Sequence, residues 1–317
     1  MIIDALNQFL RAYIVNPALS TNGDPIGGTA GFLKILQKLC REIKPDRVVI
    51  CWDGVGGSRR RKLVNKNYKE GRKPIRLNRD IRNLTEQQEI QNKVWQQTRL
   101  LEMLNETPFI QLMLPDIEAD DIVSYIVQNS RYRGWQKIIV SSDKDFFQLL
   151  DDETVLYRPI QKEVLNKNSI AEKYGIHPVN MALARAIVGD KSDNLEGVKG
   201  VGLSTVAKRF PFLAEPESYT IKDVIEHSKN VPVELKAYKA VSESQQLIAE
   251  NYKLMQLYVP QVSVHSAKKI DHIIESAPRH FNKTAIRAMM LEDGFGETNW
   301  TDLFQRCNKI SLDYRSH

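Results

Sequence analysis

Residues 137–149 read KIIVSSDKDFFQL. The first half, residues 137–142, is a short run rich in isoleucine and valine, which is typical of a buried strand. Asp143 and Asp145 follow where that strand ends. In an open parallel sheet, ligands bind outside the carboxyl ends of the strands. The segment therefore predicts a buried strand that delivers acidic side chains to a binding edge.

Three more apolar runs end in acidic residues in the same way. We expect these strands at residues 1–3, 47–52 and 109–114. The acids that follow them are Asp4, Asp53, Glu118, Asp120 and Asp121. The loop GDKSDN adds Asp190 and Asp193. Because the carboxyl ends of parallel strands meet at one edge, the sequence predicts that these acids gather there.

A single acid after a strand is more often the N-cap of the next helix. The joint pattern favours a metal site, because clustered carboxylates repel each other unless a cation neutralises them. Oxygen ligands without cysteine or histidine suit Mg²⁺ or Mn²⁺. Such a cluster can hold two ions about 4 Å apart, an arrangement that hydrolyses phosphodiesters.

Helical patterns alternate with the strands, which implies an α/β fold with a mostly parallel sheet covered on both faces. These helices are expected at residues 31–43, 86–104 and 119–127, with a further strand at 154–157. From residue 168 the helices follow one another, at 170–174, 179–188, 204–210, 221–227, 235–255 and 285–291. We therefore expect two domains, residues 1–180 and 181–317.

Positive charge is concentrated in one segment. The 317 residues carry a net charge of +6, with 45 Lys and Arg against 39 Asp and Glu. Residues 59–82 hold eleven basic and two acidic side chains, so the rest of the chain is net negative. Such a block is either a solvated face or a contact for a polyanion, with nucleic acid the first candidate.

The sequence GVKGVG, residues 197–202, separates two helical segments. Glycines there permit a tight turn and a close backbone approach to a ligand. The N-terminus of the following helix would face a phosphate. A glycine turn is more often a plain helix connection, but this alternation resembles the helix-hairpin-helix element that contacts duplex DNA.

Composition excludes several classes of protein. With 42% hydrophobic and 26% charged residues, the chain is neither disordered nor collagen-like. Its three cysteines have no metal-type spacing and do not form a disulfide framework. No run reaches the ~18 apolar residues of a membrane span, and the N-terminus lacks a signal-peptide pattern. We expect a cytoplasmic protein without a membrane partner.

Six motifs in order identify a family: IIDALNQFLRA, VVICWDG, YKEGR, IEADD, SSDKDFFQL and GDKSDNLEGVKGVG. The chain resembles the flap endonuclease and 5′→3′ exonuclease family of phage nucleases, phage RNase H and the nuclease domain of bacterial DNA polymerase I. The resemblance covers residues 1 to about 210. It implies a PIN-like core with a twisted, mostly parallel sheet, a helical arch at about 55–104 and a helix-three-turn-helix at about 185–212.

The resemblance also implies roles for individual residues. Lys69 and Arg72 would contact the scissile phosphate at the base of the arch. Two Mg²⁺ or Mn²⁺ ions would be held by Asp4, Asp53, Glu118, Asp120, Asp121, Asp143, Asp145, Asp190 and Asp193. DNA would be contacted by Arg11, Arg59, Arg60, Arg61, Lys62, Lys66, Lys73, Arg76, Lys199, Gly200, Gly202 and Lys208. The family often binds K⁺ at the helix-three-turn-helix.

The implied function is a structure-specific 5′-nuclease that removes RNA primers and 5′ flaps in replication. Its substrates would be DNA flaps, nicks or gaps, with RNA–DNA hybrids as a further candidate. A single-strand binding protein or sliding clamp is a candidate partner, and the chain would act as a monomer. The alternatives are a PIN-type ribonuclease, which lacks the GVKGVG element, and a catalytically inactive DNA-structure binder.

Overall fold

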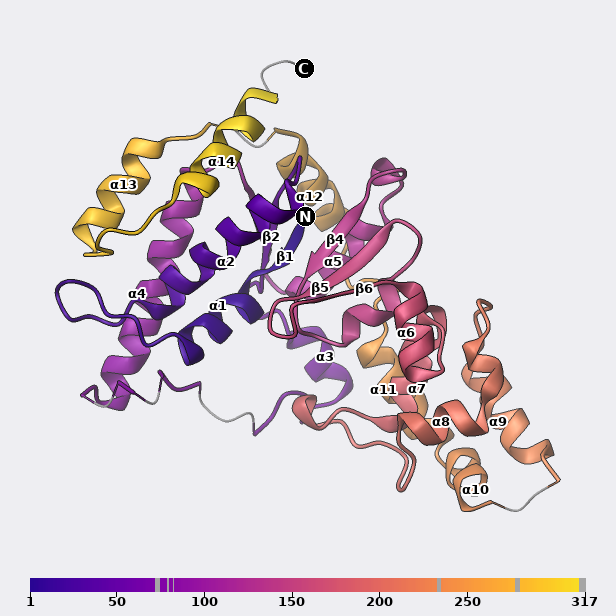
Figure 1. Cartoon of the computed structure of the whole chain (residues 1–317). Coiled ribbons are helices and arrows are strands. Elements are labelled where there is room, and N and C mark those ends of the chain that lie inside the picture. The colour runs from indigo at the N-terminus through magenta and orange to yellow at the C-terminus, as the bar shows by residue number, and fades with distance from the viewer. Residues whose placement is uncertain (72–74, 79, 82, 233–234, 277–279, 314–317) are drawn as a thin grey trace. The chain divides into compact units, whose positions relative to one another are not determined.

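The computed structural model describes residues 1–71, 75–78, 80–81, 83–232, 235–276 and 280–313. Contacts divide the chain into two compact units, each built from separate stretches of sequence. Unit 1 comprises Met1–Trp52, Pro74–Met113 and Val264–His317, and unit 2 comprises Asp53–Lys73 and Leu114–Ser263. Figure 1 shows the elements of both units, and each unit is described separately below.

Unit 1 contains three parallel strands in the order β3-β2-β1. The strands are β1 (Ile2–Asp4), β2 (Val49–Trp52) and β3 (Ile110–Met113). The helices are α1 (Ala5–Val15), α2 (Gly27–Ile43), α4 (Glu86–Asn105), α12 (Val264–Ser276), α13 (Lys283–Glu292) and α14 (Thr301–Asp313). Strands β1 and β2 are buried along their whole length, as their apolar sequences require.

Helix α2 begins four residues before the predicted start at residue 31. Its N-cap, Ile26, has no side-chain cap. The side chain of Gln96 in α4 instead accepts hydrogen bonds from the N–H groups of Gly28 and Thr29, at 2.7 and 3.1 Å. A side chain 68 residues away thus satisfies the helix start, and local sequence carries no sign of it.

Helix α4 begins with a capping box. The Thr85 hydroxyl accepts from the Gln88 N–H at 3.3 Å, and the Gln88 side chain accepts from the Thr85 N–H at 2.8 Å. Glu86 and Glu89 lie in the first turn, where the helix dipole favours negative charge. These local signals explain why the helix begins at the predicted residue.

Unit 2 contains two parallel strands, β4 (Lys137–Val140) and β5 (Thr154–Arg158), and β6 (Glu163–Leu165) antiparallel to β5. The helices are α3 (Arg59–Val64), α5 (Ala119–Gln128), α6 (Lys167–Tyr174), α7 (Pro178–Val188), α8 (Leu203–Arg209), α9 (Ile221–Asn230), α10 (Lys236–Glu243) and α11 (Gln245–Met255). Short 3₁₀ turns include η2 (Asp145–Leu149) and η3 (Lys191–Asp193). Helix α7 packs against α11 and η2 within this unit.

The expected mostly parallel α/β architecture is confirmed, with helices succeeding one another after β6. The single helix expected at residues 235–255 is wrong, since Ser244 separates α10 from α11. Elements α1, β6, α12 and α14 were not expected from the sequence. The domain division at residue 180 stays a prediction, because grouping by contacts does not test it.

Within the described residues, no helix combines the length and the apolar character that crossing a membrane takes.

Replacing Thr85 by Ala removes the hydroxyl that caps α4. We expect the free energy of unfolding, measured by urea denaturation, to fall by about 1 kcal/mol. The control is Gln87→Ala, an exposed position in the same turn and outside the capping box, which should change stability by less than about 0.5 kcal/mol. Equal losses in the two variants would contradict the capping role.

Candidate active site

Three of the predicted metal ligands meet in unit 2. Asp120 lies in the first turn of α5, and Asp143 and Asp145 follow β4. One carboxylate oxygen from each lies within 4.8 Å of the others. The Asp145 N–H also donates to the Asp143 carboxylate at 2.9 Å, which fixes the loop between them. Acids from two separate strand ends therefore converge, as the sequence predicts.

The electrostatics of this cluster call for a cation. Burial and the adjacent Asp143 carboxylate raise the pKa of Asp145 to about 7, although Arg185 opposes this shift. The Arg185 guanidinium lies 2.6 Å from the Asp145 carboxylate and 2.7 Å from that of Asp190. A divalent ion bound beside these three acids would reduce the repulsion among them and favour the ionised form of Asp145.

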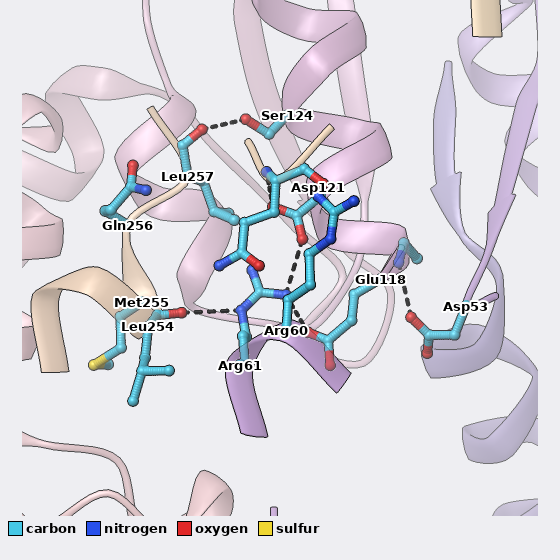
Figure 2. Close-up of polar contacts among 12 residues, drawn as sticks. Asp53, Arg60, Arg61, Glu118, Asp121, Ser124, Leu254, Met255, Gln256 and Leu257 are labelled. Atoms are coloured by element: carbon cyan, nitrogen blue, oxygen red, sulfur yellow. Dashed lines mark hydrogen bonds and ion pairs between the residues drawn. The ribbon is translucent and has the colours of Figure 1, made fainter. Parts of the chain in front are cut away.

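Glu118 and Asp121 flank Asp120 but face a buried arginine (Figure 2). The Arg61 Nη1 atom lies 2.5 Å from one Glu118 oxygen and 2.9 Å from one Asp121 oxygen. All three side chains are at most 4% exposed. Burial alone would lower the pKa of Arg61, but the carboxylates of Asp121 and Glu118 outweigh it, so the guanidinium stays charged.

Lys69 reaches Glu118 from the other side. Its ammonium lies 2.8 Å from the second Glu118 oxygen. Its backbone adopts a left-handed conformation with φ of 58°, and its N–H donates to the Asp193 carbonyl at 2.9 Å. A lysine held in this conformation stores strain, which is common at functional sites. Burial opposes the charge on Lys69, but Glu118 and Asp120 raise its pKa overall.

Several predicted ligands accept hydrogen bonds from backbone N–H groups. The Asp53 carboxylate accepts from the Ala119 N–H at 2.7 Å, at the start of α5 (Figure 2). Asp4, in unit 1, caps α1, and Asp190 caps η3. Burial works against ionisation of Asp190, but hydrogen bonds from Ser192 and the charge of Arg185 lower its pKa overall.

Most predicted DNA-binding residues are exposed. The exposed set is Arg59, Arg60, Lys62, Lys66, Arg76, Lys199, Gly200, Gly202 and Lys208. Arg11 is half-buried on α1. The structure places Arg61 differently, because its guanidinium is buried against two carboxylates and is not presented to a phosphate. Arg72 and Lys73 lie outside the described residues.

The chain between α7 and α8 makes a tight turn with close backbone contacts at its glycines. Asp190 and Leu195 exchange backbone hydrogen bonds at 2.9 and 2.8 Å, closing a small hairpin. A Cβ on Gly197 would lie 1.8 Å from the Val188 carbonyl oxygen, so only glycine fits there. Gly200 turns the chain with φ of +77°, and α8 begins after Gly202. Packing therefore requires glycine at position 197, and the backbone conformation favours it at position 200.

Comparison with known proteins shows which family the chain belongs to. Residues 1–175, more than half of the chain, match the family model described as "5'-3' exonuclease, N-terminal resolvase-like domain". The chain belongs to the 5′-3′ exonuclease family. This is the family that the sequence motifs resemble.

Relatives in this family share moderate identity with the chain. The 5′-3′ exonuclease of Aquifex aeolicus is 29% identical over 209 residues, covering 64% of this chain and 66% of the relative. The thermostable DNA polymerase I of Thermus thermophilus is 28% identical, over 66% of this chain and 23% of the polymerase. The chain thus spans just under two thirds of the first relative and about a quarter of the second.

A solved structure supports the fold over most of the chain. A bacteriophage T5 flap endonuclease, in a complex with DNA and metal ions, matches with a TM-score of 0.64 at 17% identity. The match covers 93% of this chain and 99% of the T5 chain. The expected PIN-like α/β fold is confirmed by this likeness. The helix-three-turn-helix assignment at 185–212 stays a prediction.

Sequence reasoning missed two residues of this exonuclease-family site. Arg185 pairs with Asp145 and Asp190, and Tyr68 is buried with its hydroxyl 3.4 Å from Glu118. A signal for Arg185 existed, because it is the one charged residue in the mostly apolar helix expected at 179–188. Tyr68 had a signal only in its place next to Lys69.

Gly197→Ala should lower the free energy of unfolding by about 3 kcal/mol, because the methyl group overlaps a backbone carbonyl that cannot retreat cheaply. Gly202→Ala is the matched control, since a Cβ there meets nothing within 4 Å and the backbone φ is −104°. Thermal unfolding followed by circular dichroism compares the two. Equal stability of the two variants would show that the backbone contact between Gly197 and Val188 is not tight.

Proposed function

We propose that this chain is a metal-dependent, structure-specific 5′-nuclease that cleaves DNA flaps, nicks or gaps. The observation that carries the proposal is the meeting of Asp120, Asp143 and Asp145 within 4.8 Å, in a chain of the 5′-3′ exonuclease family. Hydrolysis would add water across a P–O3′ bond and leave a 5′-phosphate and a 3′-hydroxyl.

Asp120, Asp143 and Asp145 are the residues best placed to hold a divalent ion. They fit Mg²⁺ or Mn²⁺ because all three donors are carboxylate oxygens, and because the raised pKa of Asp145 marks a surplus of negative charge. When bound, such ions activate water and stabilise charge on phosphate oxygens. A second ion, with Asp4, Asp53, Glu118, Asp121, Asp190 and Asp193 as further candidate ligands, is part of the proposal.

Lys69 would stabilise the scissile phosphate. Its ammonium is held by Glu118 and its charge is favoured by Asp120, so it lies within the field of the acidic cluster. A phosphodiester entering the site would offer it a second anionic partner, and charge that develops on the phosphate would strengthen that contact. Arg72 would have the same role by resemblance.

The exposed basic residues would hold DNA by its backbone. Contacts to phosphates position DNA without reading its sequence, which suits a structure-specific enzyme. Lys199 in the glycine turn 197–202 and Lys208 in α8 would face duplex phosphates, while Lys62 and Lys66 would face the 5′ strand. Because one set of lysines would hold the duplex and the other the 5′ strand, cleavage would depend on the shape of the substrate.

Other features of the proposal rest on the resemblance alone. These are K⁺ at the hairpin, cleavage of RNA–DNA hybrids, primer removal in replication, and a single-strand binding protein or sliding clamp as partner. We also infer a monomer in the cytoplasm. The three cysteines are buried free thiols, which suits a reducing compartment.

Asp143→Asn and Asp145→Asn should each abolish cleavage of a labelled 5′ flap in Mg²⁺, because an amide is a much weaker ligand for a hard cation. DNA binding should be largely retained. The control is Asp152→Asn, an exposed aspartate of the same segment that pairs with Lys167. Wild-type cleavage by the two cluster variants would reject the metal assignment, and Mg²⁺-independent cleavage would reject the reaction class.

Lys69→Ala should reduce the single-turnover cleavage rate by about 10²-fold, the usual cost of losing one stabilising contact in the transition state. Its affinity for flap DNA should change far less. Lys66→Ala, an exposed lysine in the same turn, is the control and should affect binding rather than rate. An unchanged rate for Lys69→Ala at saturating enzyme would remove Lys69 from the mechanism.

A further inference from the structure

Among the basic residues of segment 59–82 that the structure describes, Arg61 stands out because its side chain is 3% exposed. Two segments distant in sequence, the start of α5 and residues around Leu254, converge on it (Figure 2). Its Nη1 contacts Glu118 and Asp121 of the α5 start, and its Nε donates to the Leu254 carbonyl at 3.0 Å. A charged group this deeply buried needs all of these partners to offset its desolvation.

Each oxygen of the two carboxylates already has a partner in this arrangement. Glu118 uses one oxygen for Arg61 and the other for the Lys69 ammonium at 2.8 Å. Asp121 uses one oxygen for Arg61 and the other for the Gln261 N–H at 2.8 Å. Glu118 is therefore a bridge with a cation on each side, and the orientation of its carboxylate is fixed from the side of Arg61.

The Arg61 end of this bridge is rigid. The segment 254–261 is fastened to α5 by Asp121, and by the Ser124 hydroxyl and the Gln128 amide, which both donate to the Leu257 carbonyl. The Gln148 side chain also bonds the backbone of residues 255 and 257. Arg61 thus sits in a frame that does not move easily, whereas Lys69 is a long side chain at the partly exposed end.

We propose that Arg61 is a positioning residue, which orients Glu118 so that its second oxygen holds the Lys69 ammonium beside the acidic cluster. This inference rests on the proposed nuclease function of that cluster. Arg61 does not touch DNA, and it acts on the phosphate only through Lys69. A lysine cannot substitute fully, because one ammonium cannot reproduce the separate Nε and Nη1 contacts of a planar guanidinium.

The main test compares Arg61→Lys with Arg60→Lys. Arg60 is its exposed neighbour, which donates to the Gln261 carbonyl at 2.9 Å. Arg61→Lys keeps the buried charge, so a thermal melt should show a folded protein. Its single-turnover rate on a saturating flap substrate should fall by about 10²-fold, as small displacements of catalytic groups do. Affinity for the flap in Ca²⁺ should match that of the wild-type protein.

A double-mutant cycle shows whether Arg61 acts through Lys69. Arg61→Lys combined with Lys69→Ala should be no slower than Lys69→Ala alone, because the second change has nothing left to misplace. If the double variant lost the product of the two single-variant losses in rate, Arg61 would act independently of Lys69. That result would overturn the inference. So would a loss of DNA affinity at an unchanged rate, which is the signature of a phosphate contact.

A second readout does not require cleavage. Lys69 should react faster with an amine-acetylating reagent in Arg61→Lys than in wild type or Arg60→Lys, as followed by mass spectrometry, because Glu118 no longer holds it. Asp121→Asn leaves the Arg61–Glu118 contact in place and should label Lys69 at the wild-type rate. Unaltered labelling in Arg61→Lys sinks the inference, whereas a wild-type protein that cuts no flap but shows these labelling differences sinks only the proposed function.

Discussion

Repulsion among crowded carboxylates is the constraint on which unit 2 depends. Acids from the ends of β4, the start of α5 and the loop before α8 lie in one region, and several are partly or fully buried. Coulomb energy in such a setting would drive them apart or protonate them. Three cations offset this repulsion: Arg61 and Lys69 contact Glu118 from a segment about 50 residues away, and Arg185 contacts Asp145 and Asp190.

The sequence was informative where local chemistry decides structure. Strand-end acids identified the cluster around Asp143, and the helix expected from residue 86 begins there, where its capping box is formed by neighbouring residues. The sequence was uninformative where local structure depends on a side chain distant in sequence. The start of α2 depends on Gln96, and the burial of Arg61 depends on Glu118 and Asp121, which lie 57 and 60 residues away. A row of basic residues gives no sign of which one turns inward.

Capping and metal binding are compatible interpretations of the same acids. Asp53 accepts a backbone N–H at the start of α5, and Asp190 caps η3 while pairing with Arg185. A carboxylate has two oxygens and about four acceptor positions, so accepting one N–H does not exhaust it. Such hydrogen bonds also fix the direction of the carboxylate, which a metal site requires of its ligands.

Unit 1 is assembled from both ends of the sequence, and that has a consequence for its biosynthesis. Helix α14 packs on α2, where Arg306 donates to the carbonyls of Lys44 and Pro45 at the end of that helix. On the ribosome, α2 emerges more than 250 residues before this partner is translated. The whole of residues 53–263 is made in between, so unit 2 can fold first while the apolar surface of α2 waits, a period in which a nascent chain depends on chaperones.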